Sequence, residues 1–184
     1  VRAHRMIRVT HRSIAAAFLL VLSTPAFPSE TLCSSSEEVV FSCQVQRGRT
    51  ISVCASPSNQ GAKIAYRFGT TKKIELELAA DTSQESPPIE YNGTMGSRAS
   101  EYFVRFRSGE YTYTVQTQWD GCPWPGQTHC KKYSDFAGLL VYKSEKLITL
   151  RACTSPGTAI NTELLSRLRV PVSDKWPSDK WPAE

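Results

Sequence analysis

Histidine is nearly absent from this chain of 184 residues. His4 and His11 lie near the amino end, and His129 is the one histidine after residue 26. A Ser-His-Asp or Cys-His catalytic arrangement would therefore have to be built around His129. The chain also has no histidine pair at metal-ligand spacing and no glycine-rich phosphate loop. From these absences we expect no enzyme activity, no cofactor and no metal site.

An excess of basic charge is missing from most of the chain, although the formal net charge is +5. Four of the 22 lysines and arginines lie within residues 1–12, before any acidic residue. Beyond Ala26, the remaining 18 basic residues are nearly balanced by 17 acidic residues. A nucleic-acid partner needs a concentrated basic surface, so the charge distribution predicts no nucleic-acid binding.

Long apolar runs are absent as well, and the nine residues IAAAFLLVL at 14–22 are too few to span a bilayer. This run follows the basic residues of 1–12 and precedes the small residues STPA at 23–26, which is the order of a secretory signal peptide. We therefore expect export, cleavage after Ala26, and no membrane span in the mature protein.

Six cysteines follow the leader: Cys33, Cys43, Cys54, Cys122, Cys130 and Cys153. An even number in an exported chain indicates up to three disulfides. We predict that Cys43 bonds to Cys54 across a hairpin, that Cys122 bonds to Cys130 around a short loop, and that Cys33 bonds to Cys153.

The sequence allows two lengths for the turn of the first hairpin. A two-residue turn at Gly48-Arg49 would place Cys43 opposite Cys54. A three-residue loop would instead align the apolar residues of the two strands and move the cysteines one residue out of register.

Alternation of apolar and polar residues dominates the chain after the leader and predicts half-buried strands. Apolar residues take every second position over 62–68 and 74–80, with a turn at 69–71 between them. Two further hairpins are predicted at 101–119 and 139–152. The chain therefore reads as a series of antiparallel hairpins.

The register of the hairpin at 101–119 depends on its turn. A two-residue turn at Ser108-Gly109 would place Phe106 opposite Tyr111. In the next hairpin, a turn near residues 144–145 would place Val141 opposite Ile148 and Leu139 opposite Leu150, on one apolar face.

The remaining segments predict one loop, one helix and a tail. Residues 83–100 are rich in Ser, Pro, Gly and Glu and predict the longest loop. Ser155-Pro156 is typical of a helix start, and apolar residues at helical spacing predict a short helix that ends before Pro171. The tail, which contains DKWPSDKWP, is too short and too polar to fold alone.

Together these patterns predict a mainly β fold, an antiparallel barrel or sandwich of about eight strands with one short C-terminal helix, stapled by disulfides. The expected organisation is a signal peptide at 1–26, a single β-rich domain at 27–170 and a disordered tail at 171–184. The expected location is the periplasm or the medium, because the leader is cleavable and the cysteines are paired.

Two tryptophans are candidates for partner binding. Trp119 flanks the predicted loop closed by Cys122 and Cys130, and Trp124 lies inside it. A large aromatic side chain on a rigid loop loses little entropy on binding, which suits an anchor for a partner. Shielding of one end of the sheet is the alternative role for both tryptophans.

Carboxylates are the alternative source of chemistry. Glu75 and Glu77 share a strand face in the predicted hairpin and could act as a hydrolytic pair. Lys73 lies on that same face, and the opposite face is apolar. A solvated sheet surface therefore accounts for these residues better than an active site does.

Four segments resemble an uncharacterised family of small exported bacterial β-rich proteins: FSCQVQRGRTISVC at 41–54, IAYRFGTTKKIEL at 64–76, FRSGEYTYTV at 106–115 and KLITLRAC at 146–153. The resemblance covers most of the chain after the leader, and it implies a periplasmic or secreted β-rich domain without implying an activity.

A second, weaker resemblance is to the periplasmic inhibitors of c-type lysozyme, which present a Ser-Gly-x-x-Tyr loop. Ser108-Gly109-Glu110-Tyr111 is similar to that loop, with its tyrosine one position earlier. The resemblance implies that Ser108 and Tyr111 contact a partner protein.

The sequence thus predicts an exported, non-enzymatic binding module of the cell envelope, an inhibitor or accessory protein whose partner is an envelope or secreted protein. An envelope hydrolase that uses carboxylates or His129, and a structural envelope protein, are the alternatives.

Overall fold

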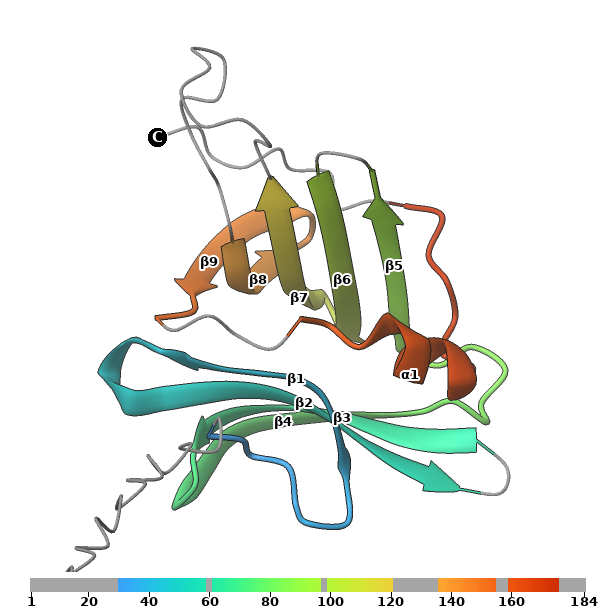
Figure 1. The fold of residues 1–184 in the computed structure, drawn as a ribbon, viewed down its shortest axis with the longest axis horizontal. Coiled ribbons are helices and arrows are strands. Elements are labelled where there is room, and N and C mark those ends of the chain that lie inside the picture. The colour runs from blue at the N-terminus through green and yellow to red at the C-terminus, as the bar shows by residue number, and fades with distance from the viewer. Residues whose placement is uncertain (1–29, 59–60, 97–98, 121–135, 155–158, 176–184) are drawn as a thin grey trace, which may run out of the picture.

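The computed structural model describes residues 30–58, 61–96, 99–120, 136–154 and 159–175. Within them the chain forms nine strands in two antiparallel sheets and one short helix, α1 (Thr162–Arg167) (Figure 1). The four-stranded sheet contains β1 (Glu38–Val45), β2 (Arg49–Ser58), β3 (Gly61–Thr70) and β4 (Lys73–Asp81). The five-stranded sheet contains β5 (Ile89–Met95), β6 (Ala99–Ser108), β7 (Tyr111–Asp120), β8 (Phe136–Lys143) and β9 (Lys146–Ala152).

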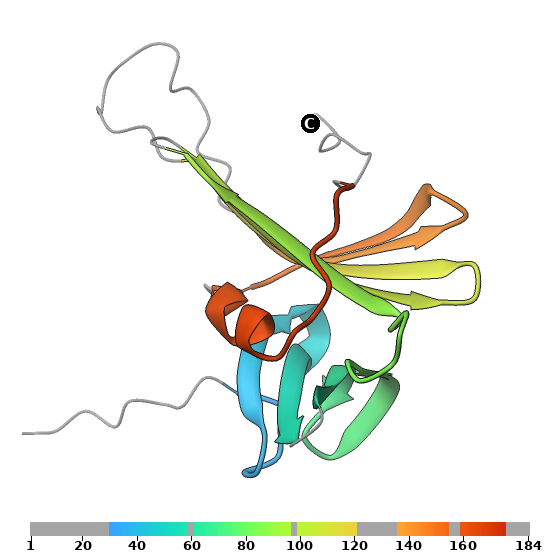
Figure 2. The ribbon, with the colours of Figure 1, turned by 90° about the vertical axis from the view of Figure 1, so that its right-hand side faces the viewer.

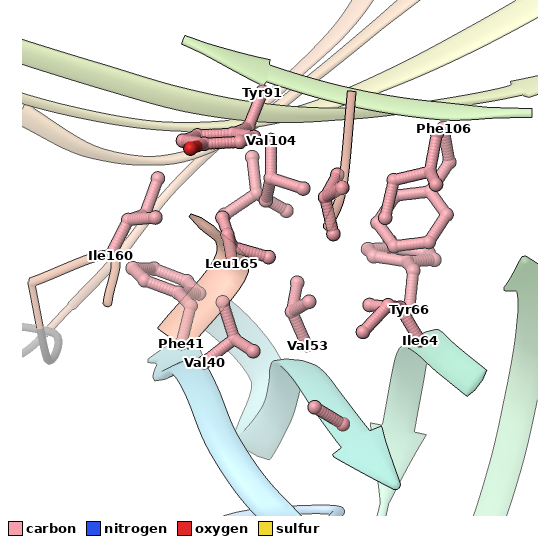
Figure 3. Packing of buried hydrophobic residues seen from close by; sticks show 14 of the residues in the cluster. Val40, Phe41, Val53, Ile64, Tyr66, Tyr91, Val104, Phe106, Ile160 and Leu165 are labelled. Atoms are coloured by element: carbon pink, nitrogen blue, oxygen red, sulfur yellow. The ribbon is translucent and has the colours of Figure 1, made fainter. Parts of the chain in front are cut away.

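The two sheets pack against each other around one apolar core. Each sheet turns its inner face toward the other, and Figure 3 shows the side chains that meet there. They include Val40, Phe41, Val53, Ile64 and Tyr66 from the four-stranded sheet and Tyr91, Val104 and Phe106 from the five-stranded sheet. Ile160 and Leu165 of the C-terminal segment enter the same core, so α1 closes the space beside β1 and β5.

The predicted hairpin over residues 62–68 and 74–80 is confirmed, although its turn lies at residues 71–72 instead of 69–71. Tyr66 pairs with Leu78 and Phe68 pairs with Leu76, and all four side chains pack in the core. Period-two alternation therefore identified the buried face correctly from Leu76 onward. Ile74, which was expected on the same face, is exposed because the ladder shifts between Ile74 and Leu76.

The barrel alternative is wrong, because no ladder of the described residues joins β4 to β5 or β9 to β1. A single bridge between Val45 and Cys153 links the sheets at the edge of β1. The C-terminal segment lies along one edge strand of each sheet, β1 and β5. Asn161 N donates to Val40 O at 2.9 Å on β1, and Tyr91 N of β5 donates to Pro171 O at 3.0 Å.

The contact with β5 extends the ordered chain past the predicted boundary at residue 171. Val172 forms a parallel bridge with Tyr91, and Ser173 N donates to Tyr91 O at 2.8 Å. Ser173 is buried. Residues 176–184, where the predicted tail continues, lie outside the described residues.

Strand β5 falls within the stretch that the sequence predicts to be a loop, residues 83–100. That prediction is wrong for Ile89–Met95, because Ile89 and Tyr91 alternate with polar residues and are buried in the core. Two apolar side chains between serine, proline and glycine residues are too weak a signal against the composition of the flanks.

Two disulfides join Cys33 to Cys54 and Cys43 to Cys153. The predicted pairings of Cys43 with Cys54 and of Cys33 with Cys153 are therefore wrong. The β1–β2 connection is the three-residue alternative, Gln46–Gly48, and it places Cys43 on the inner face while Cys54 lies on the outer face. Cysteines on opposite faces of a sheet point apart and cannot be bridged.

The outer face of the four-stranded sheet is covered by the N-terminal arm, residues 30–37. Leu32 is buried there, and its N–H donates to Ser52 Oγ at 2.9 Å. Arg67 donates to Leu32 O at 3.1 Å and to the Glu37 carboxylate at 2.6 and 3.0 Å. The Cys33–Cys54 disulfide ties this arm to β2.

The β6–β7 turn lies one residue later than predicted. Ser108 pairs directly with Tyr111, and Phe106 pairs with Tyr113 instead of Tyr111. Gly109 takes a φ of 59°, which a glycine adopts without strain, so Gly109-Glu110 forms the turn. The apolar face is unchanged, because the register moves by two positions.

The β8–β9 turn at Ser144 and Glu145 is confirmed, and both residues have positive φ. The predicted register beyond the turn is wrong, since a bulge between Val141 and Tyr142 shifts the ladder by one residue and pairs Val141 with Thr149. A bulge adds one residue to one strand, and nothing in alternation alone places it.

One short C-terminal helix is present, as predicted, but it begins later. Asn161 is the N-cap, and its side chain accepts a hydrogen bond from Leu164 N at 2.9 Å. Arg169, at a φ of 57°, ends the helix in a left-handed cap in which Val170 N donates to Leu165 O at 3.1 Å.

Several predictions fall on residues that the structure does not describe. These are the signal peptide at 1–26, the Cys122–Cys130 disulfide, Trp124 and His129. Within the described part of the chain, no helix has the length and apolar character needed to cross a bilayer.

Candidate functional site

The predicted partner-binding residues do not converge on one place. Ser108 and Tyr111 face each other beside the β6–β7 turn, whereas Trp119 lies near the other end of β7, opposite Ser100. Trp119 is 50% exposed, and Ser108 is exposed. The structure therefore separates the tryptophan from the serine and the tyrosine.

Tyr111 is half-buried and packs with neighbours on its own sheet. Its ring lies 6.5 Å from the ring of Tyr113, and Lys143 Nζ lies 5.5 Å from its ring centroid. Lys143 also pairs with Glu110 at 3.2 Å, and this hydrogen bond raises the pKa of Lys143. Figure 2 shows the β6–β7 and β8–β9 turns side by side, which agrees with the 3.0 Å hydrogen bond from Ser144 N to Glu110 O.

Glu75 and Glu77 do not form a carboxylate pair in the structure. Glu77 lies 3.2 Å from Arg67, which also binds Glu37 of the N-terminal arm. Glu75 instead contacts Arg49, with Arg49 Nε at 2.9 and 3.0 Å from its two carboxylate oxygens. The expectation that both carboxylates share one face is wrong, because a bulge lies beside Glu75.

That bulge depends on a glycine. Phe68 pairs with Leu76 and Gly69 with Ile74, so Glu75 is left without a partner in the ladder. Gly69 has a φ of 149°, and a Cβ there would lie 2.3 Å from Lys73 O and 2.8 Å from Glu75 N. Only glycine fits this close approach, and the extra residue redirects the carboxylate of Glu75.

Glu75 is one wall of a pocket of about 280 Å³, near the lower end of the range for ligand sites. The residues that line the pocket come from the β1–β2 turn and its flanking strand ends, the end of β3, the start of β4, and strand β9. Its lining residues are Val45, Gln46, Arg47, Arg49, Phe68, Glu75 and Arg151. We call this site the arginine pocket.

The arginine pocket carries three guanidinium groups and one carboxylate. Arg49 uses its Nε on Glu75, and among the described residues its Nη groups bond to no protein partner. Arg47 and Arg151 form no ion pair with any residue that the structure describes. The pocket therefore has an excess of hydrogen-bond donors with positive charge, next to the apolar side chains of Val45 and Phe68.

Arg47 holds an unusual backbone conformation, with φ 65° and ψ 30°, followed by Gly48 at φ 65°. Two consecutive left-handed residues close the three-residue β1–β2 turn. Left-handed φ is unfavourable for an arginine, and such strain clusters at functional positions. Arg47 is nevertheless one of the residues that line the pocket.

The pocket lies beside the junction of the two sheets. Val45 forms the bridge with Cys153, and Thr154 N donates to Gln44 O at 2.8 Å. Arg151 is two residues before Cys153, so the Cys43–Cys153 disulfide anchors the segment that brings Arg151 to the pocket. Arg151 is the one lining residue that comes from the five-stranded sheet.

The sequence patterns do not reveal this site. Arg151 is more than 100 positions from Arg47 and Arg49 in the chain, and arginines on strand ends look like ordinary solvated charge. The adjacent pair Arg47-Gly48 was a partial signal, since glycine in a turn marks an unusual backbone. No cluster of three or more His, Cys, Asp or Glu side chains that could hold a metal ion occurs among the residues described here.

A scan against protein-family models and searches of curated proteins and of solved structures found no match to this chain. The function is therefore argued from the arginine pocket and the fold.

Proposed function

We propose that this protein is an exported, non-enzymatic binding module that holds an anionic group of its ligand in the arginine pocket. The observation that carries the proposal is the set of three guanidinium groups around a pocket of about 280 Å³ that contains a single carboxylate. Arginine donates through a planar fork that matches carboxylate and phosphate oxygens, and it remains charged at every physiological pH.

The walls of the pocket suit a ligand with a small apolar body. Val45 is buried and Phe68 is half-buried, and both line the pocket beside the arginines. Ligand sites in proteins commonly combine apolar walls with a few polar groups that fix orientation. An acid attached to a ring or a short carbon chain would place its charge on the guanidinium groups and its body on Phe68.

The disulfides support the proposed compartment. Two disulfides in a small β-rich protein fit an oxidising extracellular compartment. We propose that the leader at 1–26 directs the chain to the periplasm or the medium, and that the two packed sheets form a β-sandwich. The resemblance to exported bacterial β-rich proteins, and the weaker one to lysozyme inhibitors, remain predictions that agree with such a location.

A partner protein of the envelope or the medium can supply the anionic group, for example as a side chain or a chain terminus. Trp119, Trp124, Ser108 and Tyr111 remain predicted contacts for such a partner. The hydrolase alternative gains no support from Glu75 and Glu77, because each is held in a separate ion pair with an arginine.

The proposal is tested by calorimetric titration of the purified, oxidised protein with phenylacetate and with phenylacetamide, its neutral analogue. We expect the acid to bind and the amide not to bind. The double variant Arg47→Ala/Arg151→Ala should weaken acid binding at least about tenfold, because each charged hydrogen bond contributes about 1.5 kcal/mol or more.

Arg167→Ala is the matched control, since Arg167 is an exposed arginine on α1 that pairs with Glu38 away from the pocket. It should leave acid binding unchanged. Equal loss in the control and the double variant, or no binding of any acid, would overturn the proposal.

A further inference from the structure

We infer that the ligand of the arginine pocket carries a hydrogen-bond donor beside its acid group, as an α-amino acid or a 2-hydroxy acid does, and that Glu75 selects for this donor. The inference rests on the proposed function, because it concerns the same pocket. It names the chemical class of the ligand.

The first support is the position of Glu75. Its carboxylate lines the pocket because the bulge beside Gly69 takes it out of the regular ladder. Gly69 is required there, since any Cβ would lie 2.3 Å from Lys73 O. Glu77, two residues later on the same strand, is held by Arg67 and does not line the pocket.

The second support is the contact between Arg49 and Glu75, which leaves hydrogen-bond donors of Arg49 and acceptor positions of Glu75 unused. Arg49 approaches Glu75 through Nε alone, at 2.9 and 3.0 Å, so its two Nη groups are left to donate to an acid. A carboxylate has about four lone-pair positions, and this contact leaves part of them unused. The Glu75 and Arg49 side chains are 33% and 35% exposed, so solvent now reaches them.

A bound ligand would exclude that solvent. An acid without a donor would bury Glu75 with unfilled acceptor positions, which is unfavourable. An acid with a neighbouring ammonium or hydroxyl group would fill those positions while its own carboxylate meets Arg47, Arg151 and the Nη groups of Arg49. The pocket is therefore complementary to an acid and a donor on adjacent atoms.

The test uses three probes that share a phenyl ring and a carboxylate: phenylacetate, mandelate with a 2-hydroxyl group, and phenylglycine with a 2-ammonium group, each enantiomer taken separately. Titrations of the parent protein should show one enantiomer of phenylglycine or mandelate binding about tenfold or more tightly than phenylacetate. The preferred class, amino acid or hydroxy acid, is the one whose probe gains more affinity relative to phenylacetate.

Glu75→Gln should reduce that preference to about twofold or less, and a circular dichroism spectrum and a urea unfolding midpoint close to those of the parent check that the variant is folded. Glu77→Gln is the matched control, and it should keep the full preference. If the three acids bind equally to the parent, or if Glu75→Gln keeps the preference, the inference is wrong while the proposed function stands. If no acid binds, the proposed function fails as well.

Discussion

Arg47 combines an unfavourable backbone conformation with a place in the lining of the arginine pocket. Its φ of 65° and ψ of 30° place it in the left-handed region, which is unfavourable for a residue with a Cβ. Its side chain is exposed and forms no ion pair with the described residues, so no ion pair within that part of the chain offsets the strain. Under the proposed function, the anionic group of the ligand would account for an arginine at this position.

Arg47→Gly should raise the free energy of unfolding by up to about 1 kcal/mol, because glycine adopts this φ without strain but has more freedom in the unfolded chain. The same change should weaken the binding of phenylacetate. Urea unfolding and calorimetric titration measure the two effects separately.

Gly48→Ala is the control for Arg47→Gly. Gly48 has the same φ of 65°, and a Cβ there would meet no atom within 4 Å. An alanine at this position would therefore destabilise the fold through backbone strain alone. We expect a loss of about 1 kcal/mol with all three arginines retained. A destabilised Arg47→Gly variant would contradict the argument.

At the scale of elements, the N-terminal arm is held on the four-stranded sheet by an ion pair with little exposure. The side chains of Arg67 and Glu37 are 16% and 9% exposed, and Arg67 also donates to Leu32 O. The hydrogen bond from Arg67 lowers the pKa of Glu37 below its ordinary value near 4.5, although burial acts in the opposite direction.

This shift makes the stability of the arm depend on pH. Because the pKa of Glu37 is lower in the folded than in the unfolded chain, the unfolded chain binds the proton more readily. The stabilisation is present above the ordinary pKa, and it is lost as the pH falls through the lowered pKa. We expect stability to decrease from about pH 4.5 downward.

Glu37→Gln should lower the free energy of unfolding by about 2 kcal/mol at neutral pH, since it removes a charged hydrogen bond. The difference from the parent should shrink in acid. Urea unfolding at about pH 7 and about pH 3.5, with the disulfides intact, measures both effects.

Glu38→Gln provides a matched control one residue away, because Glu38 pairs with Arg167 and both side chains are largely exposed, at 46% and 62%. Exposed pairs contribute little, so this variant should stay close to the parent. Equal effects of the two substitutions would contradict a special role for Glu37.

At the scale of the whole molecule, the Cys33–Cys54 and Cys43–Cys153 disulfides connect different parts of the structure. Cys33–Cys54 spans 21 residues and ties the N-terminal arm to the outer face of one sheet. Cys43–Cys153 spans 110 residues and joins the edge of one sheet to the end of the other, beside the arginine pocket. Because Arg151 alone comes from the five-stranded sheet, the pocket depends on how the sheets are joined.

The double variant Cys43→Ser/Cys153→Ser should lose about 4 to 5 kcal/mol of stability, and Cys33→Ser/Cys54→Ser about 3 kcal/mol, in the chain-entropy account of loop closure. The first should also bind phenylacetate several-fold more weakly, whereas the second should bind it as the parent does. Titrations at a temperature where circular dichroism shows both variants folded test this difference. Equal affinity of the two variants would show that the disulfide does not hold the pocket together.

Much of the β structure was predictable from local alternation. The inner face of β3 and β4 follows from apolar residues at every second position, and the turn at Ser144 and Glu145 lies where it was predicted. Registers were less predictable, because one residue of difference in a turn or one bulge shifts a whole ladder. The β6–β7 turn at Gly109 and the bulge beside Glu75 are both of this kind.

The disulfide pairing and the candidate site required the tertiary structure. The sequence predicts that Cys43 and Cys54 meet across a hairpin, but the three-residue loop places them on opposite faces of the sheet. Cys43 therefore bonds to Cys153 and Cys54 to Cys33, each on a different segment. Arg47, Arg49 and Arg151 gave no common signal, because Arg47 and Arg49 lie at the β1–β2 turn whereas Arg151 lies on β9 of the other sheet.

Local patterns thus sufficed for the antiparallel strands, the short C-terminal helix and the presence of disulfides, because alternation, helical spacing and cysteine number act over a few residues or over composition alone. The division into two sheets, the pairing of the cysteines and the arginine pocket depend on which distant segments cover each face and edge. That choice is made by burial and hydrogen bonding across the whole core, where residues more than 100 positions apart come into contact.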